Sequence, residues 1–298
     1  MAQLKDIKTR LISVKSTQKI TLAMMMLSSA KLRKSQNIIQ NLYPYKQKLS
    51  QVLRQLLSGE ESICSPFTVS RTVNRVALVA FSSNTGLVGR FNNNISAELA
   101  SAFQSYLTLG KENILIYTIG TKAAKAVRKM KLEIERDYSE INVKPDYDNA
   151  QKIAVELMDL FLQEKIDRVE LIYHRFYNKG LQVIVKEQFL PFEVKLSDTS
   201  ENYTNSSNNE YSLDYIIEPD RTTILEQLIP QILKVIFFTA HIDSATSEHA
   251  SRMKAMQIAS DNADELIEEL TRDYNKLRQE SITNELLDIM GGVNNEKF

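Results

Sequence analysis

The chain has 298 residues, 43% of them hydrophobic and 25% charged, and its 37 Lys and Arg balance 37 Asp and Glu. This length allows a sizeable core in one or two domains, and the neutral balance excludes a general electrostatic attraction to nucleic acid. Cys64 is the only cysteine, so the sequence excludes an intrachain disulfide and a thiolate metal cluster and fits a reducing compartment.

The first part of the chain predicts one long helix. From Leu4 to about Ser58 there is no Gly, and Pro44 is the only Pro, where we expect a kink or the start of a second segment. The opening residues lack the apolar centre of a secretory signal. Apolar residues alternate at steps of three and four, which is typical of a coiled-coil seam. The predicted seam consists of Leu4, Ile7, Leu11 and Val14, continued by Ile20, Met24 and Leu27.

The last part, from about Thr222, predicts a second long helix. Its most apolar stretch, "ILKVIFFTA" (Ile232–Ala240), is half as long as a membrane span and predicts a buried helix segment. We expect Gly291 and Gly292 to end the helix. The predicted seam consists of Met256, Ala263, Leu270 and Leu277, with Ala259 and Leu266 at the alternate positions and Ile282, Leu286 and Ile289 beyond them.

The two predicted helices are too long for the core of a compact domain, since a helix of about 55 residues spans roughly 80 Å. Their charges are opposite. Residues 1–58 hold eleven Lys and Arg and one acid, whereas residues 241–298 hold six Lys and Arg and twelve acids. Opposite fields favour association, so we expect the terminal helices to pair as an antiparallel coiled coil that projects from the rest of the molecule.

The middle of the chain predicts an α/β domain. Runs of β-branched and aromatic residues alternate with helical patterns, which indicates a Rossmann-like, mostly parallel sheet flanked by helices. The last two strands are separated only by "YNKG", which predicts a hairpin. The predicted strands are 75–81, 113–120, 132–138 (the weakest), 167–176 and 181–189, and the helices are 96–109, 122–131 and 149–165. The expected division is a helix at 1–60, the α/β domain at 70–195, a flexible polar loop at 196–212 and a helix at 213–290.

Few residues suggest chemistry. "SSNTGLVGRFNNN" (Ser82–Asn94) lies between a strand and a helix, where α/β folds bind phosphate. Its G-x-x-G pattern is neither a dinucleotide fingerprint nor a P-loop, so a tight turn with an Asn helix cap is the favoured interpretation. His241 and His249 are too far apart for one metal ion, and we expect both at the surface or in the helix seam. No catalytic, cofactor or metal site is predicted. Two classes remain: a structural protein that serves as a scaffold or in coupling, and an α/β enzyme or ligand-binding module with helical arms.

Both ends of the chain resemble one family. The run "IKTRLISVKSTQKITLAMMMLSSAKLRKSQ" (Ile7–Gln36), the run "SEHASRMKAMQIASDNADELIEEL" (Ser247–Leu270) and the run "YNKLRQESITNELLDIMGG" (Tyr274–Gly292) resemble the opening and closing signatures of the gamma subunit of F-type ATP synthase. The segments "SSNTGLVGRFN" and "YIIEPD" (Tyr215–Asp220) resemble its internal landmarks. The turn departs from the family pattern at Val88 and Arg90. The thiol pair of the chloroplast branch has no counterpart, and no targeting peptide precedes the first motif, so we expect a bacterial protein.

The resemblance implies a rotor. Its shaft would turn inside a ring of alpha and beta subunits and its α/β body would lie on the membrane c ring beside epsilon, with delta in the same complex. The protein would then be peripheral to the cytoplasmic face of the inner membrane, and ATP would be made in beta. Small residues such as Ser28 and Ser260 would face the ring. The implied contacts are Arg278, Gln279 and Thr283 with a beta catch loop, Arg252 and Met24 with an acidic beta lever loop, and Tyr215 and Glu218 with the c ring.

Overall fold

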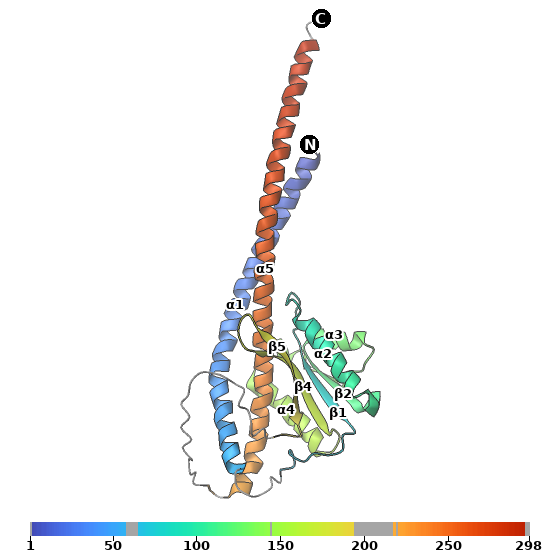
Figure 1. The fold of residues 1–298 in the computed structure, drawn as a ribbon, viewed down its shortest axis with the longest axis vertical. Helices are drawn as coiled ribbons and strands as arrows, with labels where there is room; N and C mark the ends of the chain where they lie inside the picture. Colours follow the sequence, from blue (N-terminus) through green and yellow to red (C-terminus); the bar gives the residue numbers. More distant parts are fainter. Residues whose placement is uncertain (1, 58–64, 144, 194–216, 219, 296–298) are drawn as a thin grey trace.

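Two long helices and a smaller α/β body make up the molecule. The computed structural model describes residues 2–57, 65–143, 145–193, 217, 218 and 220–295. Cys64, Tyr215 and the predicted loop 196–212 lie outside the described residues. Helix α1 (Ala2–Leu57) and helix α5 (Arg221–Asn295) run side by side in opposite directions, and the body packs against one end of the pair (Figure 1). The predicted antiparallel pairing of the terminal helices is confirmed.

Both long helices continue through residues that usually interrupt a helix. Helix α1 passes through Pro44 without a break, so no second segment begins there. Helix α5 passes through Pro230 and then through Gly291 and Gly292 to Asn295. The prediction that the two glycines end the helix is therefore wrong. Glycine lowers helix stability by only about 1 kcal/mol relative to alanine, which weakens a helix without changing its geometry.

The body contains a five-stranded sheet in the order β3-β2-β1-β4-β5. Strands β1, β2, β3 and β4 are parallel, and β5 pairs antiparallel with β4 as the predicted hairpin. The weak strand predicted at 132–138 shrinks to two residues. The strands are β1 (Val76–Phe81), β2 (Ile114–Ile119), β3 (Arg136–Asp137), β4 (Arg168–Phe176) and β5 (Gln182–Leu190).

Helices cover both faces of the sheet. On β1, Val76, Leu78 and Ala80 pack against α2 and α3, whereas Ala77, Val79 and Phe81 pack toward α4, α5 and α1 (Figure 1). A central strand buried on both sides is an almost continuous apolar run, as "VALVAF" is. The helices of the body are α2 (Phe91–Ser105), α3 (Thr121–Lys129) and α4 (Tyr147–Leu162), with short 3-10 turns at Leu107–Leu109, Lys111–Asn113 and Ile141–Val143.

The lower part of α5 belongs to the core of the body. Phe237 packs against the rings of Phe81 and Phe189, with centroids 5.5 and 5.8 Å away. By length and composition alone, α5 includes one window apolar enough to cross a membrane, with a mean hydropathy of 1.3, and 44% of that window is buried inside the molecule. Burial against the sheet, α4 and α1 accounts for this composition. The prediction that Ile232–Ala240 is a buried helix segment is confirmed.

The seam on α1 differs from the prediction halfway along. Leu4, Ile7, Leu11 and Val14 are half-buried as expected, but Ile20 is 59% exposed and Leu27 is 64% exposed. The three-four alternation continues instead through a mixture of polar and apolar residues, and a seam follows the helix repeat whether or not each position is apolar. The observed positions after Val14 are Gln18, Thr21, Met25, Ser28 and Leu32.

The seam on α5 agrees better. Met256, Ala263 and Leu270 are buried and Leu277 is half-buried, whereas the predicted Leu266 is 41% exposed and Ile267 takes its place. Ser28 on α1 and Ser260 on α5 are also buried in the pair. These two serines therefore do not form the outer surface of the shaft, as the sequence suggested.

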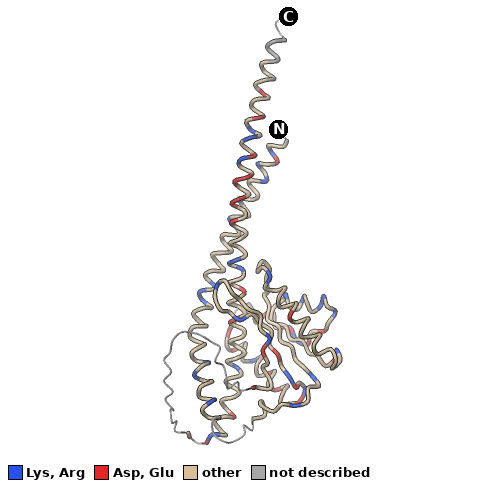
Figure 2. The backbone as a smooth tube through the Cα atoms, in the orientation of Figure 1, with Lys and Arg blue, Asp and Glu red and all other residues tan. Residues whose placement is uncertain are grey.

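The two long helices carry opposite charges, which attract each other. Figure 2 shows Lys and Arg along α1 and a cluster of Asp and Glu on the facing stretch of α5. Within the described residues, no ion pair joins the two helices; the side-chain contact in this region is a hydrogen bond from Gln18 to Asp264. The predicted complementarity of charge is thus present as a distributed attraction, which salt would screen.

Candidate functional site

The end of α5 extends beyond the beginning of α1 (Figure 1). From Ile282 to Leu287 every side chain is exposed. The prediction that Ile282, Leu286 and Ile289 hold α5 to α1 is wrong, because α1 begins at Ala2 and offers no partner at that height. The exposed apolar residues of this free end are Ile282, Leu286, Leu287, Ile289 and Met290.

The three residues assigned to a catch loop lie just below this free end. Arg278, Gln279 and Thr283 are all exposed on α5. The Thr283 hydroxyl donates a hydrogen bond to the Gln279 carbonyl oxygen in its own helix, at 2.9 Å. Within the described part of the chain, the Arg278 and Gln279 side chains make no hydrogen bond or ion pair. Their donors are available to another molecule.

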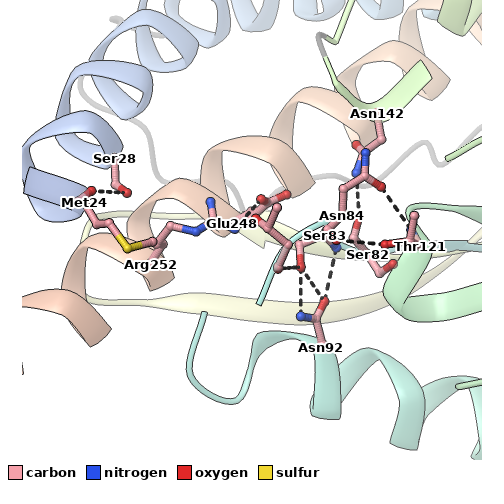
Figure 3. Close-up of polar contacts among 11 residues, drawn as sticks. Met24, Ser28, Ser82, Ser83, Asn84, Asn92, Thr121, Asn142, Glu248 and Arg252 are labelled. Carbon is pink, nitrogen blue, oxygen red and sulfur yellow. Dashed lines mark hydrogen bonds and ion pairs between the residues drawn. The ribbon is translucent and has the colours of Figure 1, made fainter. Parts of the chain in front are cut away.

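Arg252 lies in a different setting, at the point where α5 leaves the body. Its side chain is held on two sides: Nη2 donates to Thr85 Oγ1 at 2.8 Å and to Glu248 Oε1 at 2.7 Å. The residue is only 8% exposed. Met24 on α1 is half-buried, and its carbonyl oxygen accepts a hydrogen bond from the Ser28 hydroxyl at 2.7 Å (Figure 3). The structure therefore separates Arg252, which is bonded within the protein, from Arg278, whose side chain is exposed.

The turn at the carboxyl end of β1 is closed by its own hydrogen bonds. Asn92 Oδ1 accepts from the Ser83 amide at 3.1 Å, and Asn84 Oδ1 accepts from the Thr121 amide at 3.0 Å. Ser82 Oγ accepts from the Ala123 amide at 2.8 Å. Figure 3 shows these contacts converging on the turn. These bonds occupy the Ser83 amide and the amides of Thr121 and Ala123 at the start of α3, so side chains of the turn bond within the protein, which favours the tight-turn interpretation.

The helix caps in this region differ from the prediction. The residue before α2 is Arg90, which makes no side-chain capping bond, so the predicted Asn cap of α2 is wrong. Asn92 instead closes the preceding turn, and Asn84 caps the first amide of α3. Gly120 is required here, because a Cβ atom on it would lie 2.1 Å from the Ser82 carbonyl oxygen.

The three histidines are shielded from water and neutral. His241 is 1% exposed, with Nε2 lying 3.2 Å from Asn142 Oδ1, and His174 stacks on Phe91 with ring centroids 4.3 Å apart. Burial lowers the pKa of each of the three, including the half-buried His249, to about 4. A surface position for His241 is therefore wrong, because this part of α5 packs into the body. No group of metal-binding side chains occurs in the described ranges.

Sequence reasoning missed one buried acid, Asp243. It is 1% exposed on α5 and accepts a hydrogen bond from the Tyr43 hydroxyl of α1. Burial raises its pKa to about 7, against the lowering effect of the Tyr43 hydrogen bond. An acid three residues after the apolar run Ile232–Ala240 was the available signal.

Glu218, the described member of the segment assigned to the c ring, is exposed just before the start of α5. Tyr215 lies outside the described residues. The start of α5, which Glu218 precedes, lies at the end of the helix pair opposite to the free tip (Figure 1).

Comparisons with known proteins agree along the whole chain. A family model described as ATP synthase matches residues 3–295. The chain is 49% identical over 292 residues to the ATP synthase gamma chain of Bacteroides fragilis, covering 98% of this chain and 99% of that relative. It is 43% identical over 294 residues to the ATP synthase gamma chain of Christiangramia forsetii, covering 98% of each.

The fold is similar to a chain in the structure of the Euglena gracilis mitochondrial ATP synthase with OSCP, F1 and c-ring in rotational state 3. The TM-score is 0.64 at 17% sequence identity, and the match covers 98% of this chain and 94% of that one. Because the family model and relatives of more than 40% identity span nearly all of its length, the chain belongs to the ATP synthase gamma chain family.

Proposed function

We propose that the chain is the central rotor of a proton-translocating F-type ATP synthase and couples rotation of the c ring to conformational cycling of the beta subunits. The observation that carries the proposal is the helix pair itself. It leaves the body, stands clear of it, and ends in a single helix whose apolar side chains are exposed and whose Arg278 and Gln279 side chains make no hydrogen bond within the described chain. Family membership supports the same function.

The asymmetry of the shaft supplies the coupling. Each beta subunit meets a different side of the shaft as it turns, and a contact shifts a conformational equilibrium only if it binds one conformation better than another. The two sides differ in chemistry: α1 presents Lys and Arg, and α5 presents Asp and Glu (Figure 2). The exposed apolar side chains add further differences. On the paired part of the shaft they are Ile12, Ile20, Met26, Leu27, Ile258 and Leu266.

The proposed beta contacts fall at two heights. Arg278, Gln279 and Thr283 would bind the catch loop of one beta subunit near the tip. The side chains of Arg278 and Gln279 make no hydrogen bond or ion pair within the described part of the chain. Met24 and Arg252 would lie near the acidic lever loop, at the level of the body. Such a loop would meet a guanidinium that Glu248 already partly neutralises.

The remaining assignments concern the complex. Tyr215 and Glu218 would lie near the c ring, with the body resting on c and epsilon and with delta in the same assembly. The chain would be peripheral, on the cytoplasmic face of a bacterial inner membrane. It would need no cofactor and would not itself catalyse ATP synthesis, which would take place in beta.

Reconstitution tests the proposal. The full chain is mixed with alpha and beta subunits of the same complex, and we expect assembly at one copy per three alpha and three beta, with ATP hydrolysis that turns a bead attached to α2. A chain that remains a stable monomer in this mixture would exclude the rotor function. Calorimetry with ATP and ADP addresses the alternative, an α/β ligand-binding module, which predicts tight one-to-one binding by the isolated chain. The turn after β1 is closed by the side chains of Asn84 and Asn92, which argues against that alternative.

A further inference from the structure

The burial of α5 changes abruptly along its length. Between Ile229 and Ser247 the helix is buried on most sides by α1, α4 and the sheet, whereas from Met256 onward only the seam residues are covered. Arg252 lies in the stretch between these two parts of the helix, residues 248–255, which is about two turns. It is therefore the last buried side chain before α5 depends on α1 alone.

A set of polar contacts joins this part of α5, residues 247–252, to the ends of the strands. The Ser247 hydroxyl donates to the His174 carbonyl of β4 at 3.1 Å, and the Ser251 hydroxyl donates to Gln182 Oε1 of β5 at 3.2 Å. The contact from Arg252 to Thr85 reaches the turn after β1. Only this last contact uses a charged donor, and charge-assisted hydrogen bonds are roughly twice as strong as neutral ones.

The chemistry of the Arg252 contact suits a fixed joint. Glu248, one turn earlier on α5, holds the guanidinium by an ion pair of 2.7 Å in which both side chains are largely shielded from water. The guanidinium thereby also reaches the body, where Thr85 Oγ1 accepts its hydrogen bond. Arg252 and Glu248 are both on α5 and therefore move with it. The contact between this ion pair and the body is the hydrogen bond to Thr85.

We propose that Arg252 is a positioning residue that fixes the direction in which the shaft leaves the body, with Thr85 as its anchor and Glu248 as its orienting partner. The proposal rests on the proposed rotor function, because torque that enters through the body must then pass into α5 at this turn. A stiff rod clamped at one end bends most at the clamp. Loss of the Thr85 anchor therefore lets the shaft change its angle to the body without unfolding either part.

The first experiment uses the isolated full chain, so it does not depend on rotor function. Spin labels are placed at Ser101→Cys on α2 and Glu268→Cys on α5, both exposed positions, in a Cys64→Ser background, and the distribution of distances between them is measured. We expect Thr85→Val, which keeps the shape and removes the hydroxyl, to broaden the distribution. Thr85→Ser, which keeps the hydroxyl, restores the narrow one. An unchanged width in Thr85→Val would overturn the proposal.

A matched control separates the anchor from general loss of a hydroxyl. Ser96→Ala removes a hydroxyl that bonds only to the Asn92 carbonyl next to it in the body, and we expect it to leave the distribution narrow. Broadening by Ser96→Ala equal to that by Thr85→Val would also overturn the proposal. Melting curves of each variant show whether any broadening comes from partial unfolding of the body instead, which would count against a joint.

A second experiment uses the assembled complex and a bead on α2. We expect Thr85→Val to widen the angular fluctuations of the bead during each pause while the rate of ATP hydrolysis stays at the wild-type value, and Thr85→Ser to restore the width. A wild-type chain that does not rotate would refute the rotor function. A rotating complex in which Thr85→Val has the wild-type width would refute the joint alone.

Discussion

The hydroxyl of Tyr43 lies 2.7 Å from Oδ1 of Asp243 and donates a hydrogen bond to it, joining α1 to α5 across 200 positions of the sequence. The carboxyl group is almost fully buried. Burial has the largest effect and raises its pKa to about 7; Arg175 on β4 and Lys46 on α1 lower the pKa, and Glu187 on β5 raises it. The acid thus titrates near neutral pH inside the molecule.

Replacing Asp243 with Asn should change how stability depends on pH. The folded pKa of about 7 exceeds the usual value of 3.8, so the wild type binds this proton more tightly when folded and loses stability as the pH rises from about 4 to 7. We expect Asp243→Asn to gain stability relative to the wild type over this range, by up to about 1.4 kcal/mol per pH unit. Above pH 7 to 8 the difference becomes constant.

Urea unfolding of the full chain at several pH values measures this effect. Tyr43→Phe serves as the companion variant, because it removes the donor and should raise the pKa of Asp243 further. A difference between wild type and Asp243→Asn that does not vary with pH would show that the acid titrates normally.

The three histidines act in the opposite direction. Their folded pKa of about 4 lies below the usual value of 6.5, so their contribution is fully present above pH 6.5 and is lost as the pH falls toward 4. We expect His241→Gln, which keeps a donor for Asn142, to reduce the loss of stability between pH 6.5 and 4. The same urea series checks this, and an acid limb as steep as that of the wild type would contradict it.

A pair of leucines on α1 tests the observed seam. Leu27 is 64% exposed and Leu32 is 1% exposed, five positions later. In the isolated chain we expect Leu27→Ala to change the free energy of unfolding by no more than about 0.5 kcal/mol, and Leu32→Ala to lower it by about 2–5 kcal/mol. Equal losses in chemical denaturation would mean that the seam had been placed on the wrong side of the helix.

Arg278 tests the proposed contact near the tip. Its side chain is exposed, so Arg278→Ala should leave the stability of the isolated chain within about 0.5 kcal/mol of the wild type. In the assembled complex, loss of a charged hydrogen bond worth roughly 1.5–3 kcal/mol should slow the step that it stabilises by about tenfold or more. Arg272→Ala, another exposed arginine on α5, is the control and should keep the wild-type rate of ATP hydrolysis. Wild-type turnover in Arg278→Ala would remove this residue from the contact.

The sequence predicted most of the elements because their local patterns are strong. β1 and β4 are apolar, β-branched runs with little polar interruption, and Ile232–Ala240 is too apolar to be exposed. Helix α2 begins at Phe91, five residues before the prediction, because the run of asparagines there resembles a loop. One of them, Asn92, does close the preceding loop by accepting a hydrogen bond from the Ser83 amide, although Asn92 itself lies in the first turn of α2.

The seam was less predictable because it passes through polar positions. Gln18, Thr21 and Ser28 continue the helix repeat, while the more apolar Ile20 and Leu27 face outward. Apolar side chains can lie either in the seam between the helices or on the outer surface of the shaft, and this shaft has several on its outer surface. A pattern based on hydrophobicity cannot separate these two uses.

The contacts at the junction were beyond sequence reasoning for another reason. Arg252 meets Thr85 across 167 positions and Asp243 meets Tyr43 across 200. Each contact depends on how α5 packs against both α1 and the sheet, and no local spacing encodes that packing. The polar cluster around Arg278, near the carboxyl end of the chain, was recognisable in the sequence, and the structure leaves it exposed.

The pairing of Gln18 with Asp264, 246 positions apart, has a consequence for synthesis on the ribosome. Helix α1 is made first, yet the helix that covers its seam is made last, and the face of the sheet that holds Phe81 also waits for Phe237. For most of translation, the nascent chain therefore exposes apolar surface that only its final quarter can cover, and such surface promotes aggregation. We expect chaperones to hold the chain until α5 is released.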